Sequence, residues 1–204
     1  MATGPEAAAG PDAADEREAR TDAPRGVPWL ALLPLAAFLL FAAVAGYFLL
    51  SGRDAAVLPS PLVGQAAPSV DLPALPAAGV PAPADLPEDG RVRLVNAWAS
   101  WCAPCRAEHA QLMSLANDED LTLIGLATKD EPEAAARFLA ELGNPFDAVG
   151  MDRDGRAMID WGVVKLPETH VVAPDGTVTH KHAGPILPEH MEGLRAAIRD
   201  AASR

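Results

Sequence analysis

The stretch VRLVNAWASWCAPCRAEH at residues 92–109 decides how the rest of the chain is interpreted. It begins with a β-branched and apolar run over 92–98, which predicts a buried strand. Helix-forming residues dominate from 103 to 116, so we expect a helix directly after this strand. The two cysteines of the chain, Cys102 and Cys105, stand at the junction of the two elements. They could form a structural staple, half of a metal site or a reversible dithiol.

The rest of this region alternates between strand and helix patterns. Strands are predicted at 121–127 and near 146–149, and helices at 131–143, 156–161 and 187–202. Residues 168–184 contain two alternating runs around Asp175 and Gly176, which predicts a β-hairpin. This order of elements predicts an α/β fold with a mixed central sheet and helices on both faces, which is the thioredoxin-like arrangement.

The position of the cysteines favours a reversible dithiol. Cys102 ends the predicted strand, and Cys105 lies in the first helical turn, where free N–H groups and the positive end of the helix dipole favour a thiolate. Pro104 is compatible with this turn because a first-turn N–H has no intrahelical partner. A disulfide across two residues closes too short a loop to add much stability as a staple.

No metal site and no organic cofactor are expected. A structural zinc site normally has four ligands, and no second cysteine pair or compact histidine pair follows in the sequence. His180 and His182 flank Lys181 on a predicted strand and could face one side, but surface histidines often do so. The sequence also offers no glycine-rich loop for a phosphate-bearing cofactor.

An uncharged apolar run at 27–50, VPWLALLPLAAFLLFAAVAGYFLL, predicts attachment to a membrane. A helix of this length would cross the roughly 30 Å hydrocarbon layer of a bilayer. Arginines precede the run, whereas Arg53 is the only basic residue between it and Arg91, so residues 51–204 are expected outside the cytoplasm. We prefer an uncleaved signal-anchor to a cleaved signal peptide, because the run exceeds a typical signal-peptide core.

The composition divides the chain into four expected parts. They are a disordered cytoplasmic tail at 1–26, the transmembrane signal-anchor at 27–50, a tether at 51–61 and a thioredoxin-like domain at 62–204. The formal net charge of −12 argues against sequence-independent binding of nucleic acid, which depends on clustered lysine and arginine.

Residues 62–198 resemble the membrane-anchored thioredoxin-like proteins of the cytochrome c maturation type (DsbE/CcmG). The matching segments are LVGQAAPSVDLPAL at 62–75, LVNAWASWCAPCRAEH at 94–109, TKD at 128–130, ELGNPF at 141–146, DRDG at 152–155, PET at 167–169 and HAG at 182–184. WCAPCR alone is typical of any thioredoxin-like protein, whereas its combination with ELGNPF and PET is more specific.

The resemblance implies a site for thiol–disulfide exchange. Cys102 is expected to be the more exposed thiol and the nucleophile, and Cys105 the shielded thiol that resolves the mixed disulfide. Trp101 and Pro104 would shape an apolar lip around the nucleophile. Pro167 would be a cis-proline beside which the substrate backbone binds, the alternative being a trans proline that opens an edge strand.

The resemblance also implies partners. The substrate would be the haem-binding cysteine pair of apocytochrome c, or a cytochrome c assembly protein that reduces it, with electrons from a membrane thiol transporter. A general extracytoplasmic thiol–disulfide exchanger with other clients is one alternative. A copper metallochaperone is another, although the two-residue spacing of the cysteines speaks against it.

The proton acceptor for Cys105 is less obvious. Thioredoxins proper carry a buried acid at the position of Asn96, which cannot titrate. Glu168, next to Pro167, is the nearest replacement as a base, and otherwise it is a surface carboxylate. Glu108, one helical turn after Cys105, is expected to be solvated.

Three departures from the family pattern concern substrate specificity. Lys165 stands where the family usually has glycine, and His170 stands where an aromatic residue often follows PET. The TKD segment lacks the aromatic residue that often precedes it. These differences leave the dithiol chemistry untouched.

Overall fold

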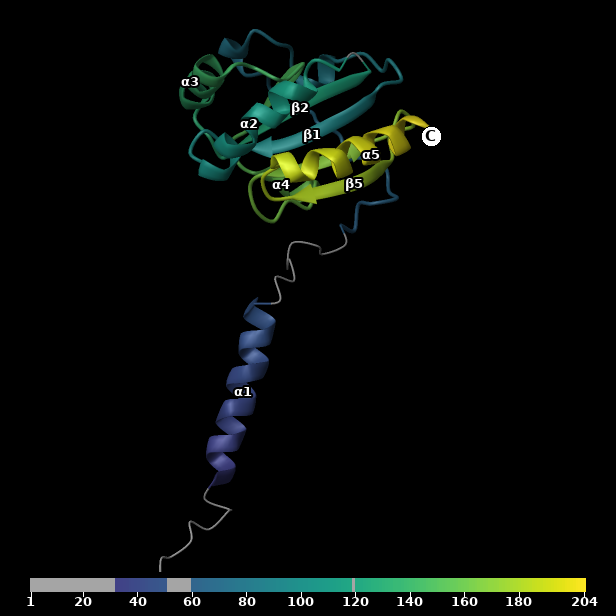
Figure 1. Cartoon of the computed structure of the whole chain (residues 1–204). Helices are drawn as coiled ribbons and strands as arrows, with labels where there is room; N and C mark the ends of the chain where they lie inside the picture. Colours follow the sequence, from purple (N-terminus) through teal and green to yellow (C-terminus); the bar gives the residue numbers. More distant parts are fainter. Residues whose placement is uncertain (1–31, 51–59, 119) are drawn as a thin grey trace, which may run out of the picture. The chain divides into compact units, whose positions relative to one another are not determined.

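A computed structural model gives the structure of the chain and describes residues 32–50, 60–118 and 120–204 (Figure 1). The chain divides into two compact units at Arg53. The tail expected at 1–26 and nearly all of the tether expected at 51–61 lie outside the described residues.

The first unit contains helix α1, Leu33–Leu50. Its 18 residues include no charged side chain, and its bulky apolar side chains, such as Phe38, Leu40 and Phe41, are exposed. The first residues of the expected anchor, 27–31, are outside the described part of the chain. Considering the described residues alone, no helix is both long enough and apolar enough to span a bilayer.

The described residues of the second unit form a five-stranded mixed sheet with the strand order β3-β2-β1-β4-β5. The strands are β1 Val92–Trp98, β2 Leu121–Thr128, β3 Ala148–Asp152, β4 Glu168–Val172 and β5 Val178–Ala183. Strands β1, β2 and β3 run parallel, β4 is antiparallel to β1, and β5 is antiparallel to β4. The mixed sheet and its C-terminal hairpin agree with the prediction from the sequence.

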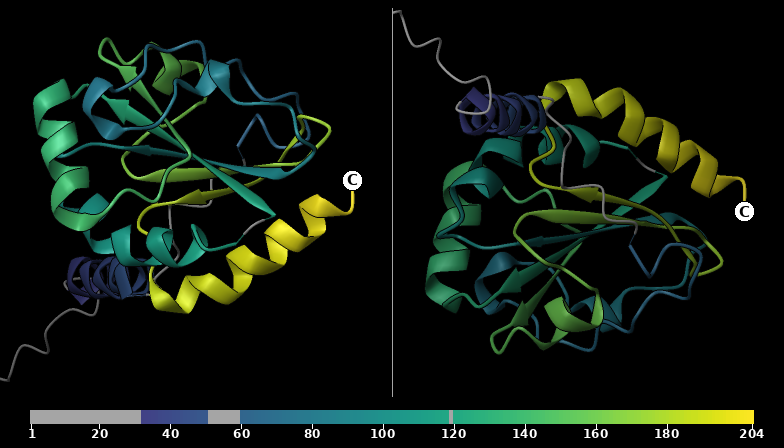
Figure 2. Two further views of the ribbon diagram at one scale, coloured as in Figure 1. Left: turned by 90° about the horizontal axis from the view of Figure 1, so that it is seen from above. Right: turned by 90° about the horizontal axis from the view of Figure 1, so that it is seen from below.

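Helices cover both faces of this sheet, as Figure 2 shows. The helices are α2 Ala103–Leu115, α3 Pro132–Leu142, α4 Arg156–Asp160 and α5 Met191–Ala202. Leu112 of α2, Phe138 of α3 and Leu194 of α5 belong to one apolar cluster on one face. Ala157 of α4 belongs to a second cluster on the other face, together with Val95 and Ile124 of the sheet. The two-sided core is the thioredoxin-like arrangement.

Two boundaries differ from the prediction. Strand β3 begins at Ala148 rather than at Phe146, because the backbone N–H of Phe146 donates to the Asn144 side chain at 3.0 Å instead of to a neighbouring strand. The Phe146 ring stacks on Trp98 in the core, with ring centroids 5.7 Å apart. The C-terminal helix begins with a separate 3-10 turn, η4 Pro188–His190, before α5. The proline-rich loop at 76–90 contains two further 3-10 turns, η2 Pro76–Ala78 and η3 Pro83–Asp85.

Candidate functional site

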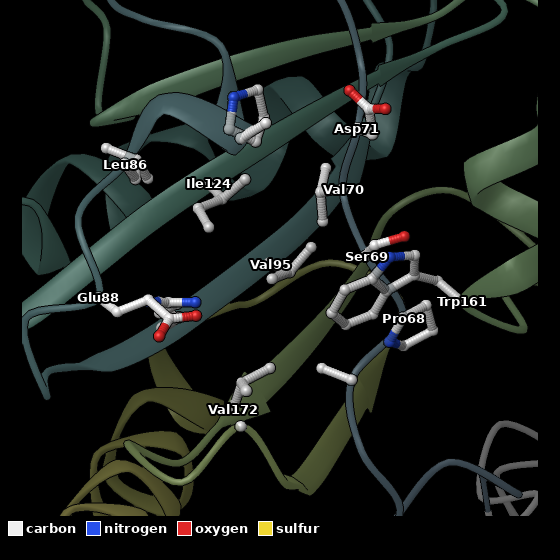
Figure 3. Close-up of a pocket in the computed structure, with 15 residues that line it drawn as sticks. Pro68, Ser69, Val70, Asp71, Leu86, Glu88, Val95, Ile124, Trp161 and Val172 are labelled. Atoms are coloured by element: carbon white, nitrogen blue, oxygen red, sulfur yellow. The ribbon is translucent and has the colours of Figure 1, made fainter.

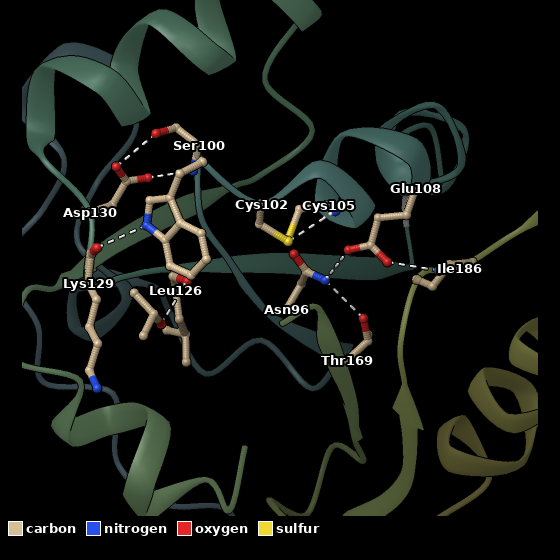
Figure 4. Close-up of a disulfide and its surroundings, with 12 residues drawn as sticks. Asn96, Ser100, Cys102, Cys105, Glu108, Leu126, Lys129, Asp130, Thr169 and Ile186 are labelled. Atoms are coloured by element: carbon tan, nitrogen blue, oxygen red, sulfur yellow. Dashed lines mark hydrogen bonds between the residues drawn. A yellow bond between two sulfur atoms is a disulfide. The ribbon is translucent and has the colours of Figure 1, made fainter. Parts of the chain in front are cut away.

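Cys102 and Cys105 form a disulfide where β1 leads into α2 (Figure 4). Cys102 is the N-cap of α2, and its Sγ accepts a hydrogen bond from the backbone N–H of Cys105 at 3.2 Å. Pro104 lies in the first turn, as expected. The sulfur of Cys102 therefore lies against the unpaired amides of a helix N-terminus, which is where a thiolate is stabilised.

The exposure of the two cysteines differs less than expected. Cys102 is 5% exposed and Cys105 is 2% exposed in the disulfide form, so the reactivity of Cys102 as the exposed thiol of the reduced form stays a prediction. Both residues pack into the apolar cluster that also contains Trp98 and Ala99. Cys102 keeps only a small margin as the more accessible residue.

Trp101 is the exposed side chain of this region, at 64% exposure. Its indole Nε1–H donates to the backbone carbonyl of Lys129 at 3.0 Å, which fixes one edge of the ring. The next residue, Asp130, accepts hydrogen bonds from the backbone N–H of Ser100 at 2.5 Å and from its hydroxyl at 2.8 Å. These bonds tie the TKD segment to the cysteine loop, and Figure 4 shows Ser100, Asp130 and Lys129 linked in this way next to the cysteines.

Pro167 lies at the same end of the sheet as the disulfide. The Leu166–Pro167 peptide bond is cis, as the resemblance implied. Ala97 of β1 pairs with Glu168 of β4, so Pro167 comes opposite the end of β1, directly before the cysteine loop. The structure therefore brings Pro167 towards the two cysteines.

Glu108 is completely buried, so the expectation that it is solvated is wrong. Its Oε1 accepts from the Asn96 side-chain amide at 2.9 Å, and its Oε2 accepts from the backbone N–H of Ile186 at 2.8 Å. Burial raises the pKa of Glu108 to about 7, although both hydrogen bonds act in the opposite direction. At neutral pH this carboxyl group can therefore both take up and release a proton.

Glu108 also lies close to the shielded cysteine. Cys105 and Glu108 are one turn apart on α2 and border the same gap in the core, which is too small for a water molecule. Asn96 holds the carboxyl group in place and itself donates to the Thr169 hydroxyl at 3.0 Å. Asn96, which stands at the position of the buried acid of thioredoxins, thus orients the carboxyl group of Glu108.

The sequence contains a signal that could have identified Glu108. Cys105, Glu108, Leu112 and Leu115 are spaced three to four residues apart, which places them on one face of a helix. Because Leu112 and Leu115 are core residues, this spacing predicts that Glu108 faces the core as well.

Glu168 is also buried, at 2% exposure, but it faces the other side of the sheet. Side chains alternate along a strand, and the next residue, Thr169, contacts Asn96 on the face that carries Cys105. Glu168 instead forms an ion pair with Lys181 of β5, with 2.7 Å between Oε2 and Nζ. The role of Glu168 as a base stays a prediction, and Glu108 is the carboxyl group that borders Cys105.

His170 lies on the face of the sheet opposite Cys105, where its strand partner Val95 belongs to the second apolar cluster. His170 is 1% exposed and contacts Trp161 edge to face, with ring centroids 5.2 Å apart. Burial, together with the nearby Lys181 and His180, lowers its pKa to about 4, so His170 is neutral at pH 7. Within the described ranges, no three or more histidine, cysteine or acidic side chains are grouped as a metal site would require.

A cavity of about 360 Å³ lies on the face of the sheet that carries α4 (Figure 3). Val95, Ile124 and Val172 of the sheet contribute to its lining, together with Trp161 and the segment at 67–71. None of the residues predicted for the site is among its lining residues. The cavity is therefore separate from the candidate site.

Comparison with known proteins identifies close relatives. The family model named Redoxin matches residues 62–198. The thiol:disulfide interchange protein CycY of Rhizobium leguminosarum bv. viciae is 41% identical over 182 residues, covering 86% of this chain and 96% of the relative. A thiol:disulfide interchange protein DsbE homolog of Paracoccus denitrificans is 45% identical over 158 residues, covering 78% of this chain and 86% of the relative.

Solved structures show the same fold. A thiol-disulfide oxidoreductase from Bacteroides fragilis superposes with a TM-score of 0.54 at 21% identity, covering 65% of this chain and 98% of that chain. At this level of identity the similarity concerns the fold alone.

Proposed function

Because the chain belongs to the Redoxin family and, within it, to the DsbE-type thiol:disulfide interchange proteins, we propose that it reduces disulfides during cytochrome c maturation. The chain is a thiol:disulfide oxidoreductase. Its proposed substrate is the disulfide of the haem-binding cysteine pair in apocytochrome c, or in an assembly protein that reduces that pair. The observation that carries the thiol chemistry is the Cys102–Cys105 disulfide at the N-terminus of α2, beside the buried carboxyl group of Glu108.

The proposed reaction starts from the reduced protein. The thiolate of Cys102 attacks one sulfur of the substrate disulfide, so that a mixed disulfide forms and the other substrate sulfur leaves as a thiolate. The thiolate of Cys105 then attacks Sγ of Cys102 and displaces the second substrate sulfur. Two electrons pass to the substrate, and the protein ends in the disulfide form.

The surrounding residues have different roles in this proposal. Glu108 accepts the proton of Cys105 when Cys105 becomes the attacking thiolate, which its pKa of about 7 and its position on α2 support. Trp101 and Pro104 form the apolar lip beside Cys102. The backbone next to Pro167 receives the extended substrate.

The proposed location is the cytoplasmic membrane, with residues 51–204 in the periplasm or an equivalent extracytoplasmic space. The uncharged run at 27–50 and the arginines before it support a signal-anchor. A membrane thiol transporter supplies electrons in this proposal, because an oxidising exterior cannot. A reporter active only outside the cytoplasm, fused after Arg204, should be active, and recovery of a soluble form that starts after Ala45 would contradict the anchor.

Covalent trapping tests the function. In cells that carry Cys105→Ser, the mixed disulfide through Cys102 cannot resolve and should accumulate. The trapped partner should be apocytochrome c or a cytochrome c assembly protein, and Cys102→Ser should trap nothing by this route. Trapping of unrelated extracytoplasmic proteins alone would instead identify a general exchanger.

Chemical rescue tests the direction of electron flow. Cells with either substitution should fail to attach haem to c-type cytochromes and should recover when a thiol reductant is added to the medium. A missing reductase can be bypassed by another source of electrons, whereas a missing metallochaperone cannot. If added thiol leaves the defect unchanged, or if an oxidant cures it, the proposed reductase function is wrong.

A further inference from the structure

A buried ion pair holds the loop that leads into Pro167, and the reaction described above does not use it. Lys181 Nζ lies 2.7 Å from Glu168 Oε2 and donates a hydrogen bond to the backbone carbonyl of Gly162 at 2.9 Å. Glu168 Oε1 accepts from the backbone N–H of Val164 at 3.4 Å. Lys181 therefore binds the backbone before Val163, at Gly162, and Glu168 binds the backbone after it, at Val164.

The loop at 162–166 offers backbone that a substrate can use. The Val164 side chain is 74% exposed, and Lys165 is exposed as well. Within residues 60–118 and 120–204, the backbone N–H groups of Lys165 and Leu166 have no hydrogen-bond partner. An extended peptide can add to such an open edge through main-chain hydrogen bonds.

Both partners of the ion pair are largely shielded from water. The side chains of Glu168 and Lys181 are only 2% and 11% exposed. Removing one partner of a buried pair leaves an uncompensated charge, so the remaining group must move or change its protonation. Substitution of Lys181 therefore removes the hydrogen bond to Gly162 and also displaces Glu168, which accepts the hydrogen bond of Val164.

We propose that Lys181 is a positioning residue, which fixes the 162–166 backbone through Gly162 and Glu168 so that it receives the substrate main chain beside the disulfide. This inference rests on the proposed function. Lys181 itself contacts neither the cysteines nor the substrate in this arrangement, and its effect on the reaction passes through the loop.

Amide hydrogen exchange tests whether the pair holds the loop. In the full-length chain, purified in detergent micelles, Lys181→Met should speed exchange of the Val164 amide at least tenfold, whereas the amides of Leu94 and Val171 in the sheet should change only as far as the variant's loss of unfolding free energy requires. The double variant Glu168→Gln/Lys181→Met carries no buried charge and serves where the single variant does not fold. It should show the same selective loss at Val164.

Substrate comparison separates positioning from a general structural role. With the same variants, kcat/KM for a peptide that contains a Cys-X-X-Cys disulfide should fall about tenfold. For bis(2-hydroxyethyl) disulfide, which has no peptide backbone, it should change less than twofold. Lys181→Arg, which keeps the cation, should restore most of the preference for the peptide, and Arg195→Met on α5 is the control for loss of a surface cation.

The outcomes distinguish this inference from the proposed function. An equal loss with both disulfides, or an unchanged Val164 amide in an active enzyme, would overturn the role of Lys181 and leave the reductase function standing. A wild-type chain that reduces neither disulfide would overturn the proposed function. In that case the exchange of Val164 would still decide whether the ion pair holds the loop.

Discussion

Glu108 and Glu168 are both almost fully buried near the end of β1, but they lie on opposite faces of the sheet and have opposite kinds of partner. Glu108 receives hydrogen bonds from neutral groups only, Asn96 and the backbone of Ile186, and burial raises its pKa to about 7. Glu168 faces the ammonium group of Lys181 at 2.7 Å. One carboxyl group can exchange a proton at neutral pH, whereas the other belongs to an ion pair.

The comparison shows that burial alone does not identify a proton carrier. A carboxyl group without a cation is the one whose protonated form burial favours, and it is therefore available as an acid or base. A carboxylate beside a cation is stabilised in its charged form and acts through the geometry it imposes.

The largest effect is expected from breaking the ion pair. Lys181→Met leaves the Glu168 carboxylate buried without a partner and should lower the free energy of unfolding by about 3–5 kcal/mol. Adding Glu168→Gln to this variant should recover much of the loss, because no buried charge remains. Denaturant unfolding of both variants at pH 7 measures the difference. Equal stabilities of the single and double variants would show that the two side chains do not act as a pair.

The next effect concerns the pH dependence of stability. The pKa of Glu108 is raised from 4.5 to about 7, so between these values the folded chain binds more protons than the unfolded chain. Its contribution to stability is therefore lost as the pH rises from about 4.5 to about 7, by roughly 3 kcal/mol in total. His170 has the opposite sign, because its pKa is lowered from 6.5 to about 4. Its contribution to stability is gained as the pH rises from about 4 to 6.5.

These two contributions oppose each other in the wild-type chain, and substitution should separate them. Glu108→Gln should make stability rise with pH between about 4.5 and 7, relative to wild type. His170→Phe should make it fall with pH between about 4 and 6.5. The difference in unfolding free energy between variant and wild type, measured at several pH values, isolates each group. A flat difference for Glu108→Gln would mean that its carboxyl group titrates at its ordinary value.

A smaller effect is expected on the second chemical step. Positioned bases contribute about 100-fold or more, which corresponds to roughly 2.7 kcal/mol. Glu108→Gln should therefore slow release of a peptide from its mixed disulfide with Cys102 about 100-fold at pH 7, and much less at pH 9, where Cys105 loses its proton unaided. Rapid acid quenching of the preformed mixed disulfide measures this step. If Glu168→Gln slows it more than Glu108→Gln, Glu168 is the base.

Much of the fold could be predicted from local sequence. The apolar run at 92–98 is β1, and the helical pattern from 103 is α2, because each element buries residues at its own period. The position of the cysteines at the start of α2 followed from these two elements. Family resemblance added the cis geometry of Pro167, which no periodicity indicates.

The environment of the two glutamates was harder to predict. Glutamate side chains are usually exposed because they are charged at pH 7 in water, and the expectation of a solvated Glu108 rests on this tendency. The helical spacing instead places Glu108 beside Cys105 on the core face. The contact of Glu168 with Lys181 depends on the register of the hairpin, in which Lys181 pairs with His170 and is thus a diagonal neighbour of Glu168. The register of the hairpin shifts between Val171 and Val172, so the cross-strand neighbours of Glu168 cannot be found by counting residues outward from the turn.

The smallest effect is expected from a third glutamate, on the surface near the cysteines. Glu141 of α3 pairs with Arg106, the residue after Cys105, at 3.0 Å, but the two side chains are 63% and 46% exposed. Water solvates both ions when the pair is broken, so Glu141→Gln should change the free energy of unfolding by no more than about 0.5 kcal/mol. It should also leave the release of a peptide from Cys102 within twofold, since Arg106 still lies over the Phe138 ring, 5.0 Å from its centroid. Glu141→Gln is therefore the matched control for loss of a carboxylate near α2, and it is measured beside Glu108→Gln in the same unfolding and acid-quench experiments. A loss as large as that of Glu108→Gln would mean that charge near the helix, rather than a buried carboxyl group beside Cys105, controls the second step.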